Sequence, residues 1–560
     1  MLRLAPGAVM LGTFALAAAS ARGQPAAPTE ELRVRVEALA VAPRIDGAAT
    51  ADPWFLIRFY ERRRFAPAWD DARLDALLRA LDGSDEHGLA PDDYHVDSIR
   101  AHRAGTGSVE DESPADARIH LDILATDALA RYAFHLRFGK VDPEMLDPAW
   151  NFTRTLEGVD AVNAVQRLMD APDMGDALRE LAPREEHYEA LLDALAAYRA
   201  IERAGGWPDL PAGETLRAGM RSPRVAQLRE RLRIGGYLDP AERDAARGEP
   251  ADPELFDRTV ERAVTKFQRL HGLTRDGAVG AGTLAALNVP VRARIDQLRV
   301  NLERVRWIFR DLEPRYVLAN IARFRVSLIE NDETIWTTRA VVGRPYRQTP
   351  SFRARMTYLV LNPTWTVPPG IMRADLLPEL RRDPAALARR NMVVLDTSGN
   401  EVDPARVDWN ASPFPYMLRQ HPGPDNALGR VKFMFPNPHH VYMHDTPSRE
   451  LFERADRTFS SGCIRLENPL ELAELLLAET GQWDRPALER ALANGRQRTV
   501  NLPRPLTVLL IYATAVPEEG ELYLLADVYG RDARLLEALN EEFRFSPPAG
   551  YENSLLPLEL

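Results

Sequence analysis

The sequence predicts a multidomain α+β protein with a mostly helical N-terminal scaffold, a small three-helix module and a mainly-β domain that contains a helical lid insertion. Three observations support this class. The length of 560 residues allows three or four domains of about 150 residues each. Apolar residues recur at helical spacing through most of the first half of the chain. Short runs rich in β-branched and aromatic residues, which are typical of strands, begin at residue 314.

The N-terminus has the pattern of an export signal. Residues 1–21 begin with a positive charge at Arg3, continue in an apolar run to Ala19 and end in small residues. This order is typical of a cleaved secretory signal peptide, with an uncleaved membrane anchor as the alternative interpretation. We therefore expect export to the periplasm. Residues 22–45 are rich in Ala, Pro and Glu and are predicted to be a linker.

Two helical regions follow the predicted linker. Residues 46–210 are mostly helical in pattern and are expected to form a scaffold domain. Residues 215–290 predict a three-helix module, whose first helix has Ser222 as a suitable N-cap and Pro223 at the first helical position. The apolar residues of that helix fall on one face: Val225, Leu228 and Leu232.

Residues 314–515 are expected to form the mainly-β domain. Their strand-like runs predict an antiparallel sheet. The strand pattern lapses at about residues 370–415, where a helical stretch is followed by a short hairpin pattern. Insertions of this kind often act as lids over a site. Residues 516–560 remain as a C-terminal extension.

The composition limits the classes of function. The formal net charge of −11 at pH 7 argues against a nucleic-acid partner, which usually needs a basic domain or stripe. The sequence contains one cysteine, Cys463. In an exported protein, an unpaired cysteine indicates an intermolecular disulfide or a reactive thiol. One cysteine with scattered histidines lacks the ligand spacing of a zinc site, so we expect no metal and no cofactor.

The surroundings of Cys463 favour a reactive thiol. A cysteine nucleophile needs a base that accepts its proton and a third group that orients the base. His444 is the best candidate for the base, because it ends a strand-like run and opens a turn in the same domain. His439 and His440 stand beside a proline at the start of that run and are better explained as structural residues.

The residues on either side of the cysteine suggest how a substrate would be held. Gly462 allows close backbone approach, so backbone N–H groups near it could form an oxyanion hole. Ser460 and Ser461 could bind the substrate or merely cap the turn. Arg465 could bind a substrate carboxylate through two hydrogen bonds, or could pair with Glu467.

Several segments resemble known families. "SPRVAQLRERL", "AVTKFQRLHGL" and "DGAVGAGTLAALN" resemble a type-1 peptidoglycan-binding domain. "VYMHDTPSRELFERADRTFSSGCIRLENP" is similar to the active-site segment of L,D-transpeptidases with a YkuD-like catalytic domain, and "VVGRPYRQTPSF" and "LNPTWTVPPGI" resemble other segments of that family. Many members have histidine directly before Gly-Cys, where this sequence has Ser461. The order of scaffold, peptidoglycan-binding module and catalytic domain with a lid is similar to the large periplasmic subfamily.

The resemblance implies an acyltransferase of cell-wall biogenesis that contributes to cell shape. Cys463 would attack the carbonyl of the L-centre of a diaminopimelate–D-Ala bond, His444 would be general base and then acid, and the backbone carbonyl of Asp445 would orient His444. The side-chain amine of a second stem peptide would resolve the thioester and give a 3→3 crosslink. Trp365 and Tyr442 would bind the substrate, together with three residues of the cysteine segment: Ser460, Ser461 and Arg465.

Two other functions remain open from the sequence. An L,D-carboxypeptidase would release D-Ala and let water resolve the thioester. A non-catalytic peptidoglycan-binding protein would bind the cell wall through the helical module. The expected partners are donor and acceptor stem peptides and carbapenem-type inhibitors that acylate the thiol. We expect a monomer with no nucleic-acid partner.

Overall fold

The structure is a computed structural model. It describes residues 28–45, 47–106, 113–238, 252–309 and 312–556. The predicted signal peptide over residues 1–21 lies outside the described residues, so the export expectation stays a prediction. Every helix in the described ranges is too short or too polar to cross a bilayer.

The described chain forms two compact units. One consists of the residues up to Asp71 together with Asp97–Asp127, and the other consists of Ala72–Val96 and the residues from Ala128 onward. The first unit holds α1 (Pro28–Ala38), β1 (Arg44–Ile45), β2 (Ala48–Ala49), α2 (Pro53–Arg62), most of α4 (Val96–Ala104) and the first part of α5 (Pro114–Phe138).

Helix α1 contradicts part of the predicted linker. Residues 22–45 were predicted to be a linker, yet Leu32 and Val36 are buried one helical turn apart on α1. The helix contains three glutamates and two arginines, which have high helix propensity, and burial of Leu32 and Val36 stabilises it. A buried hydrogen bond of 2.7 Å from the Tyr60 hydroxyl to Asp122 joins α2 to α5 in the same unit.

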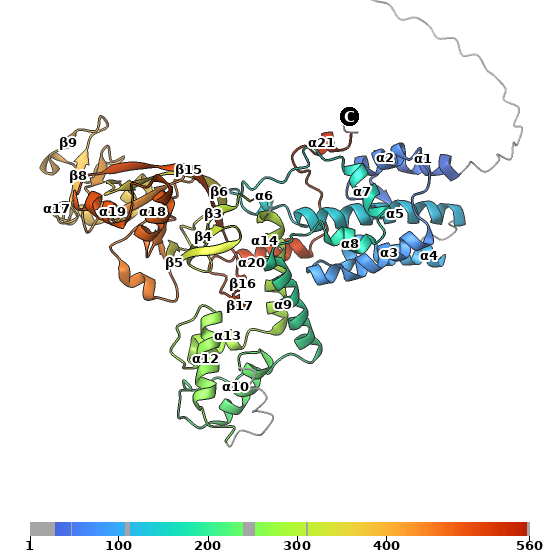
Figure 1. Cartoon of the computed structure of the whole chain (residues 1–560), viewed down its shortest axis with the longest axis horizontal. Coiled ribbons are helices and arrows are strands. Elements are labelled where there is room, and N and C mark those ends of the chain that lie inside the picture. The colour runs from blue at the N-terminus through green and yellow to red at the C-terminus, as the bar shows by residue number, and fades with distance from the viewer. Residues whose placement is uncertain (1–27, 46, 107–112, 239–251, 310–311, 557–560) are drawn as a thin grey trace, which may run out of the picture. The chain divides into compact units, whose positions relative to one another are not determined.

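Further helices confirm the predicted helical character of the N-terminal scaffold. They are α3 (Asp71–Asp82), α6 (Pro143–Leu146), α7 (Ala161–Met169), α8 (Met174–Arg179) and α9 (Glu186–Arg203), followed later by α14 (Val291–Ile308). Helices α9 and α14 lie side by side (Figure 1). On α14, the buried Arg306 pairs with Glu303 at 2.8 Å and donates to the Tyr188 hydroxyl of α9 at 2.9 Å.

The three predicted helices of the small module are α10 (Pro223–Ile234), α12 (Arg258–Leu270) and α13 (Ala281–Leu287) (Figure 1). Ser222 caps α10, because its hydroxyl accepts from the backbone N–H of Arg224 at 3.3 Å. The predicted apolar face of α10 is buried in one hydrophobic cluster with residues of α12 and α13.

The mainly-β domain contains a nine-stranded sheet. Its strands are β3 (Arg315–Asn320), β4 (Arg325–Glu330), β5 (Glu333–Gly343), β6 (Phe352–Leu361), β11 (Val431–Met434), β12 (Met443–His444), β13 (Thr458–Ser460), β14 (Ile464–Leu466) and β15 (Arg498–Ile511). The order is β13-β5-β14-β12-β11-β6-β15-β3-β4, and β4 also pairs with β5. This last pairing closes the strands from β5 to β4 into a ring.

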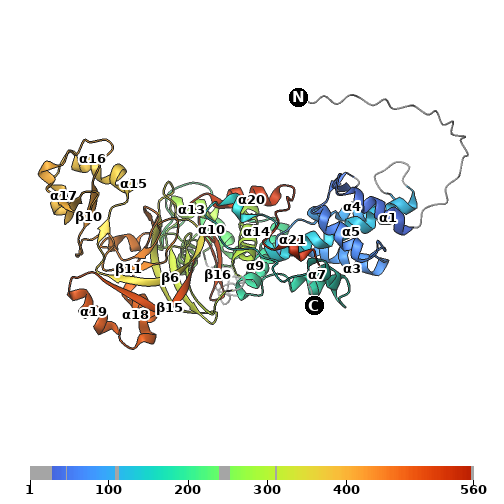
Figure 2. The ribbon, with the colours of Figure 1, turned by 90° about the horizontal axis from the view of Figure 1, so that it is seen from above.

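The expectation of a purely antiparallel sheet is wrong. Three pairs are parallel: β12 with β14, β3 with β15, and β5 with β13. A two-residue turn can produce only an antiparallel pair, whereas long connections allow parallel pairing. Helices α18 (Pro469–Leu477) and α19 (Arg485–Ala493) lie in the connection before β15. These helices lie beside the sheet (Figure 2). Their Leu472 and Leu488 are buried in the core cluster of the sheet.

The predicted lid insertion is a small α/β unit with its own core. It contains β7 (Trp365–Thr366), α15 (Pro369–Ile371), α16 (Leu377–Leu380), α17 (Ala386–Arg389), β8 (Met392–Leu395), β9 (Glu401–Val402) and β10 (Met417–Gln420). The predicted hairpin is present as β8 and β9. The insertion is not purely helical, because β7, β10, β8 and β9 form a second sheet. Strands of two to four residues are too short for a clear alternating pattern.

The C-terminal extension is described as far as residue 556. It contains the hairpin of β16 (Ala515–Glu518) and β17 (Glu521–Leu524), then α20 (Arg531–Asn540) and α21 (Tyr551–Ser554). The buried Lys140 donates to the carbonyl of Leu539 at 2.8 Å, which ties α20 to the chain after α5 within the second unit.

Candidate active site

Two short parallel strands bring the predicted catalytic residues together. Strands β12 and β14 pair so that His444 lies opposite Arg465. Alternate side chains of a strand point to the same face. Tyr442 and His444 of one strand therefore share a face with Cys463 and Arg465 of the next. Residues far apart in sequence become cross-strand neighbours, and a thiol, an imidazole, a phenol and a guanidinium converge on one surface.

The turn that holds Cys463 depends on Gly462. Its φ of +117° is in the region that favours glycine. Ser460 is buried and fastens this turn, because its hydroxyl donates to the Cys463 carbonyl at 2.5 Å and accepts from the Gly462 N–H at 3.1 Å. The structure thus places Ser460 as a turn cap. The Ser460 hydroxyl also accepts the hydrogen bond of the Gly462 N–H, which the sequence suggested as an oxyanion-hole donor.

A second segment supports the turn from the other side. Thr349 is buried, donates to the Gly462 carbonyl at 2.9 Å and accepts from the Gly343 N–H at 2.9 Å. A Cβ on Gly343 would lie 2.2 Å from the Arg347 carbonyl oxygen, so this position requires glycine. Both residues belong to the run "VVGRPYRQTPSF". Through Thr349 they hold the backbone of the cysteine turn in place.

His444 is buried and is held by the backbone. Its Nδ1 lies 2.5 Å from the carbonyl oxygen of Asp445. Burial lowers the pKa of His444 to about 3, with a further contribution from the positive charge of Arg465; the carbonyls of Asp445 and Leu428 act in the opposite direction. The imidazole is therefore neutral at physiological pH. With the proton on Nδ1, Nε2 is the nitrogen that can accept a proton.

The thiol of Cys463 is half-buried. Burial raises its pKa, opposed by hydrogen bonds from the backbone and the side chain of Tyr442 and by the positive charge of Lys432. The pKa of the Tyr442 hydroxyl is raised by burial and then by Cys463, so this hydroxyl keeps its proton and remains a donor. The thiol and the imidazole are therefore both neutral at physiological pH, and the thiol donates to the backbone carbonyl of His440 at 3.9 Å.

Arg465 has no carboxylate partner among the described residues, and its Nε is buried without a hydrogen bond. The alternative partner, Glu467, is taken by Arg339 at 2.5 Å. Burial lowers the pKa of Arg465, and the nearby Cys463 acts in the opposite direction. A half-buried guanidinium that forms no ion pair with the described residues, beside a candidate nucleophile, is suited to binding the carboxylate of a substrate.

Comparisons with known proteins match three parts of the chain to known families. Residues 314–488 match the family model of the L,D-transpeptidase catalytic domain. Residues 314–488 form an L,D-transpeptidase catalytic domain. Residues 221–287 match the model of a peptidoglycan binding domain, and residues 55–195 match that of a Scaffold domain. The transpeptidase domain contains the whole face described above.

Two curated relatives cover parts of the chain. A Haemophilus influenzae protein named "Putative L,D-transpeptidase" is 36% identical over 244 residues, which is 43% of this chain and 48% of that protein. The chain thus spans about half the length of this relative. An N-acetylmuramoyl-L-alanine amidase of Mycobacterium tuberculosis, CwlM, is 43% identical over 75 residues, or 13% of this chain and 18% of that protein.

Solved structures of L,D-transpeptidases match more weakly. LdtMt1 in complex with imipenem is 15% identical and covers 35% of this chain and 59% of its own, with a TM-score of 0.16. An L,D-transpeptidase from Xylanimonas cellulosilytica is 18% identical and covers 54% of this chain and 99% of its own, with a TM-score of 0.17.

Within the transpeptidase domain, Ser461 is exposed at the rim of the cysteine turn. Its hydroxyl accepts from Arg347 at 2.9 Å, and Arg347 also pairs with Asp375 of the insertion at 2.7 Å. Trp365 is placed differently. It lies on β7, pairs with Gln420 and packs on the insertion core, so the structure does not group it with the cysteine face.

Two residues of the site were not predicted from the sequence, Lys432 and Gly429. The ammonium of Lys432 lies 3.8 Å from the ring centroid of Tyr442, and Lys432 is directly opposite His444 across β11 and β12. Gly429 has a φ of +60°, and a Cβ there would lie 2.5 Å from the Asp445 side chain. The alternation of polar and apolar residues in "RVKFMF" could have predicted that Lys432 points to one face of a strand. The described residues hold no cluster of three or more metal-binding side chains.

Proposed function

We propose that the protein forms 3→3 crosslinks between peptidoglycan stem peptides through a cysteine thioester. Cys463 transfers its proton to Nε2 of His444 while the sulfur attacks the carbonyl at the L-centre of diaminopimelate. The carbon–nitrogen bond to D-Ala then breaks, and His444 protonates the departing amine. The side-chain amine of a second stem attacks the thioester, gives up a proton to His444 and releases the thiol.

The parallel pairing of β12 and β14 is the observation that supports this proposal most strongly. It aligns the candidate nucleophile Cys463 with a neutral histidine on one face, as general base catalysis requires. Tyr442 is the best-placed donor to an oxyanion, because its hydroxyl already bonds to the sulfur and stays protonated. Arg465 supplies a receptor for a substrate carboxylate.

The proposal is tested by incubating the full chain with purified tetrapeptide muropeptides and separating the products by liquid chromatography with mass spectrometry. We expect 3→3 dimers and free D-Ala, and neither product with Cys463→Ala. Release of D-Ala without dimers would identify an L,D-carboxypeptidase. Absence of both products, with no carbapenem adduct on Cys463, would instead support a wall-binding protein without this activity.

A further inference from the structure

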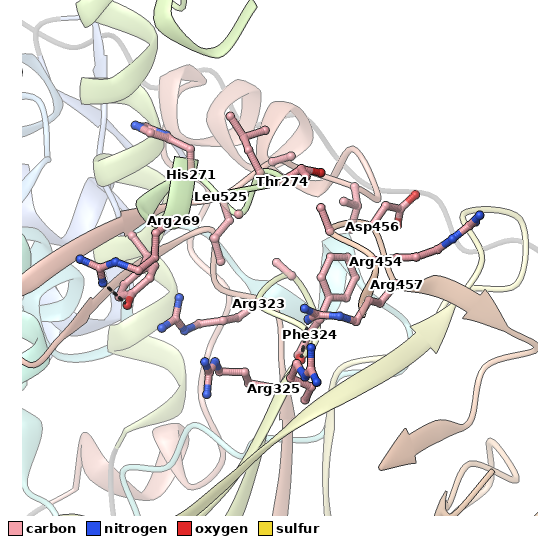
Figure 3. Close-up of a pocket in the computed structure, with 18 of the residues that line it drawn as sticks. Arg269, His271, Thr274, Arg323, Phe324, Arg325, Arg454, Asp456, Arg457 and Leu525 are labelled. Carbon is pink, nitrogen blue, oxygen red and sulfur yellow. Dashed lines mark hydrogen bonds between the residues drawn. The ribbon is translucent and has the colours of Figure 1, made fainter. Parts of the chain in front are cut away.

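An arginine-rich cavity of about 680 Å³ lies away from the cysteine face, between the peptidoglycan-binding module and the β domain in the second unit. Its walls are the loop after α12, the turn between β3 and β4, the segment 453–457 and the segment after β17 (Figure 3). None of Tyr442, His444, Cys463 and Arg465 lines it.

Part of the positive charge of this cavity is already neutralised. Three of its arginines pair with carboxylates on the protein: Arg269 with Glu521, Arg323 with Glu518, and Arg339 with Glu453. Asp456 accepts from the Thr458 hydroxyl at 2.8 Å. The buried His271 donates from Nδ1 to the Leu524 carbonyl at 2.9 Å, and its Nε2 lies 2.8 Å from the Tyr237 hydroxyl.

Four lining arginines have no carboxylate partner within the described ranges: Arg275, Arg325, Arg454 and Arg457. Arg457 is half-buried and donates to the backbone carbonyls of Phe452 and Phe324. Burial lowers the pKa of Arg457 to about 10, and the charges of Arg339 and Arg325 add to this effect. The same cause, burial followed by Arg323, lowers the pKa of Arg325. This grouping of like charges would be relieved by a bound anion.

Figure 3 shows Arg323 and Arg325 at the lower left of the cavity and Arg457 at its right, with Phe324 between them and Leu525 on the left above Arg323. The cavity is large for a single oxyanion, and its apolar wall needs a ligand with aliphatic groups. Both features favour a short peptide with several carboxylates over a phosphate. Guanidinium groups bind carboxylates through paired hydrogen bonds.

We infer that this cavity is a second binding site, which takes an acidic peptide with short aliphatic side chains and at least two carboxylates. The choice of a peptidoglycan stem peptide as that ligand rests on the proposed function. The assignment of the cavity as a binding site does not rest on the proposed function, because none of the candidate catalytic residues lines it. A stem peptide here would contact the binding module and the segment that leads into β13.

The test uses isothermal titration of the full chain carrying Cys463→Ala with the tetrapeptide L-Ala-γ-D-Glu-diaminopimelate-D-Ala. We expect two sites in this parent. Arg275→Gln combined with Arg325→Gln should weaken one of them about 10- to 100-fold, while Arg465→Gln should weaken the other. If the catalytic face does not bind the peptide, the parent shows a single site that only the cavity variant removes, which separates the two proposals.

The matched control is Arg496→Gln, an exposed arginine of the same domain outside the cavity. It should leave both sites intact. The same tetrapeptide with its carboxylates amidated should not bind to the cavity, and inorganic phosphate should not displace the peptide. Unchanged binding by the cavity variant, binding of the amidated peptide, or displacement by phosphate would each overturn the inference. If the double variant is poorly folded by circular dichroism, the exposed single variant Arg275→Gln gives the same comparison.

Discussion

The Nδ1 atom of His444 lies 2.5 Å from the backbone carbonyl oxygen of Asp445. This contact comes from the main chain, so it orients the imidazole without adding a negative charge beside it. It keeps a proton on Nδ1 and leaves Nε2 as the base. The aspartate side chain is engaged elsewhere, since its Oδ2 accepts from the Arg430 N–H at 2.9 Å.

We predict that His444→Gln slows acylation of Cys463 about 10²–10⁴-fold, the range usual for loss of a general base. The measurement is the rate at which a carbapenem adduct forms, followed by intact mass. His439→Gln is the matched control, because that ring packs on Phe352 in the same domain. An acylation rate equal to that of the unmodified protein would remove His444 from the mechanism. Asp445→Asn should have a smaller effect than His444→Gln, because the contact uses the backbone.

The resting thiol should be protonated at neutral pH. Burial raises the pKa of Cys463 and lowers that of His444 to about 3, so both shifts oppose a thiolate–imidazolium pair. The rate of alkylation by iodoacetamide should therefore rise only at alkaline pH, beyond the value of about 8.5 that is usual for a free thiol. A rate plateau between pH 5 and 7 would show an ion pair and contradict this prediction.

Lys432 should lower the pKa of the Cys463 thiol through its positive charge. Its positive charge favours the thiolate of Cys463, and its ammonium is held over the ring of Tyr442. We expect Lys432→Met to move the alkylation profile to higher pH by on the order of one unit. Lys432→Arg should retain most of the effect, since the charge is kept. If both variants titrate like the parent protein, Lys432 has only a packing role.

Removal of the Arg465 guanidinium should weaken substrate use. Arg465→Gln is expected to lower kcat/KM for a tetrapeptide donor about 10- to 100-fold, as for loss of a charge-assisted hydrogen bond. Arg465→Lys should recover only part of this, because lysine lacks the planar fork that matches a carboxylate. A donor whose carboxylates are amidated should be insensitive to both changes. An equal loss with the amidated donor would indicate a structural role.

The bridge from Ser461 through Arg347 to Asp375 should restrain the insertion. Asp375→Asn and Arg347→Gln should each increase amide hydrogen exchange in residues 369–380, about fivefold at most, because exposed ion pairs contribute roughly 0–1 kcal/mol. Arg373→Gln, on the same stretch, serves as the control. A double variant that exchanges no faster than either single one would show that the two residues act through one contact. Exchange unaffected by either change would exclude the bridge as a restraint.

Much of the fold could be predicted from local patterns. Helical periodicity identified the three helices of the small module, and its Ser222 cap is present as expected. Strand-like runs identified the β domain. Helix α1 was not predicted within the linker, because a short helix is stable only when side chains such as Leu32 and Val36 are buried against another part of the chain. The parallel pairs and the sheet of the insertion depend on contacts between distant segments, which local patterns do not encode.

The sequence by itself determined the chemical groups of the candidate site. A single cysteine behind glycine, a histidine before a turn and an arginine two residues beyond the cysteine are all readable in one dimension. Only the tertiary structure decided their use. In the structure Arg465 lies opposite His444, and Glu467 forms an ion pair with Arg339. Ser460 caps the cysteine turn, and Trp365 packs in the core of the insertion. Lys432 lies over the ring of Tyr442. The reason is physical: strand pairing sets which side chains share a face, and burial sets which of them stay neutral.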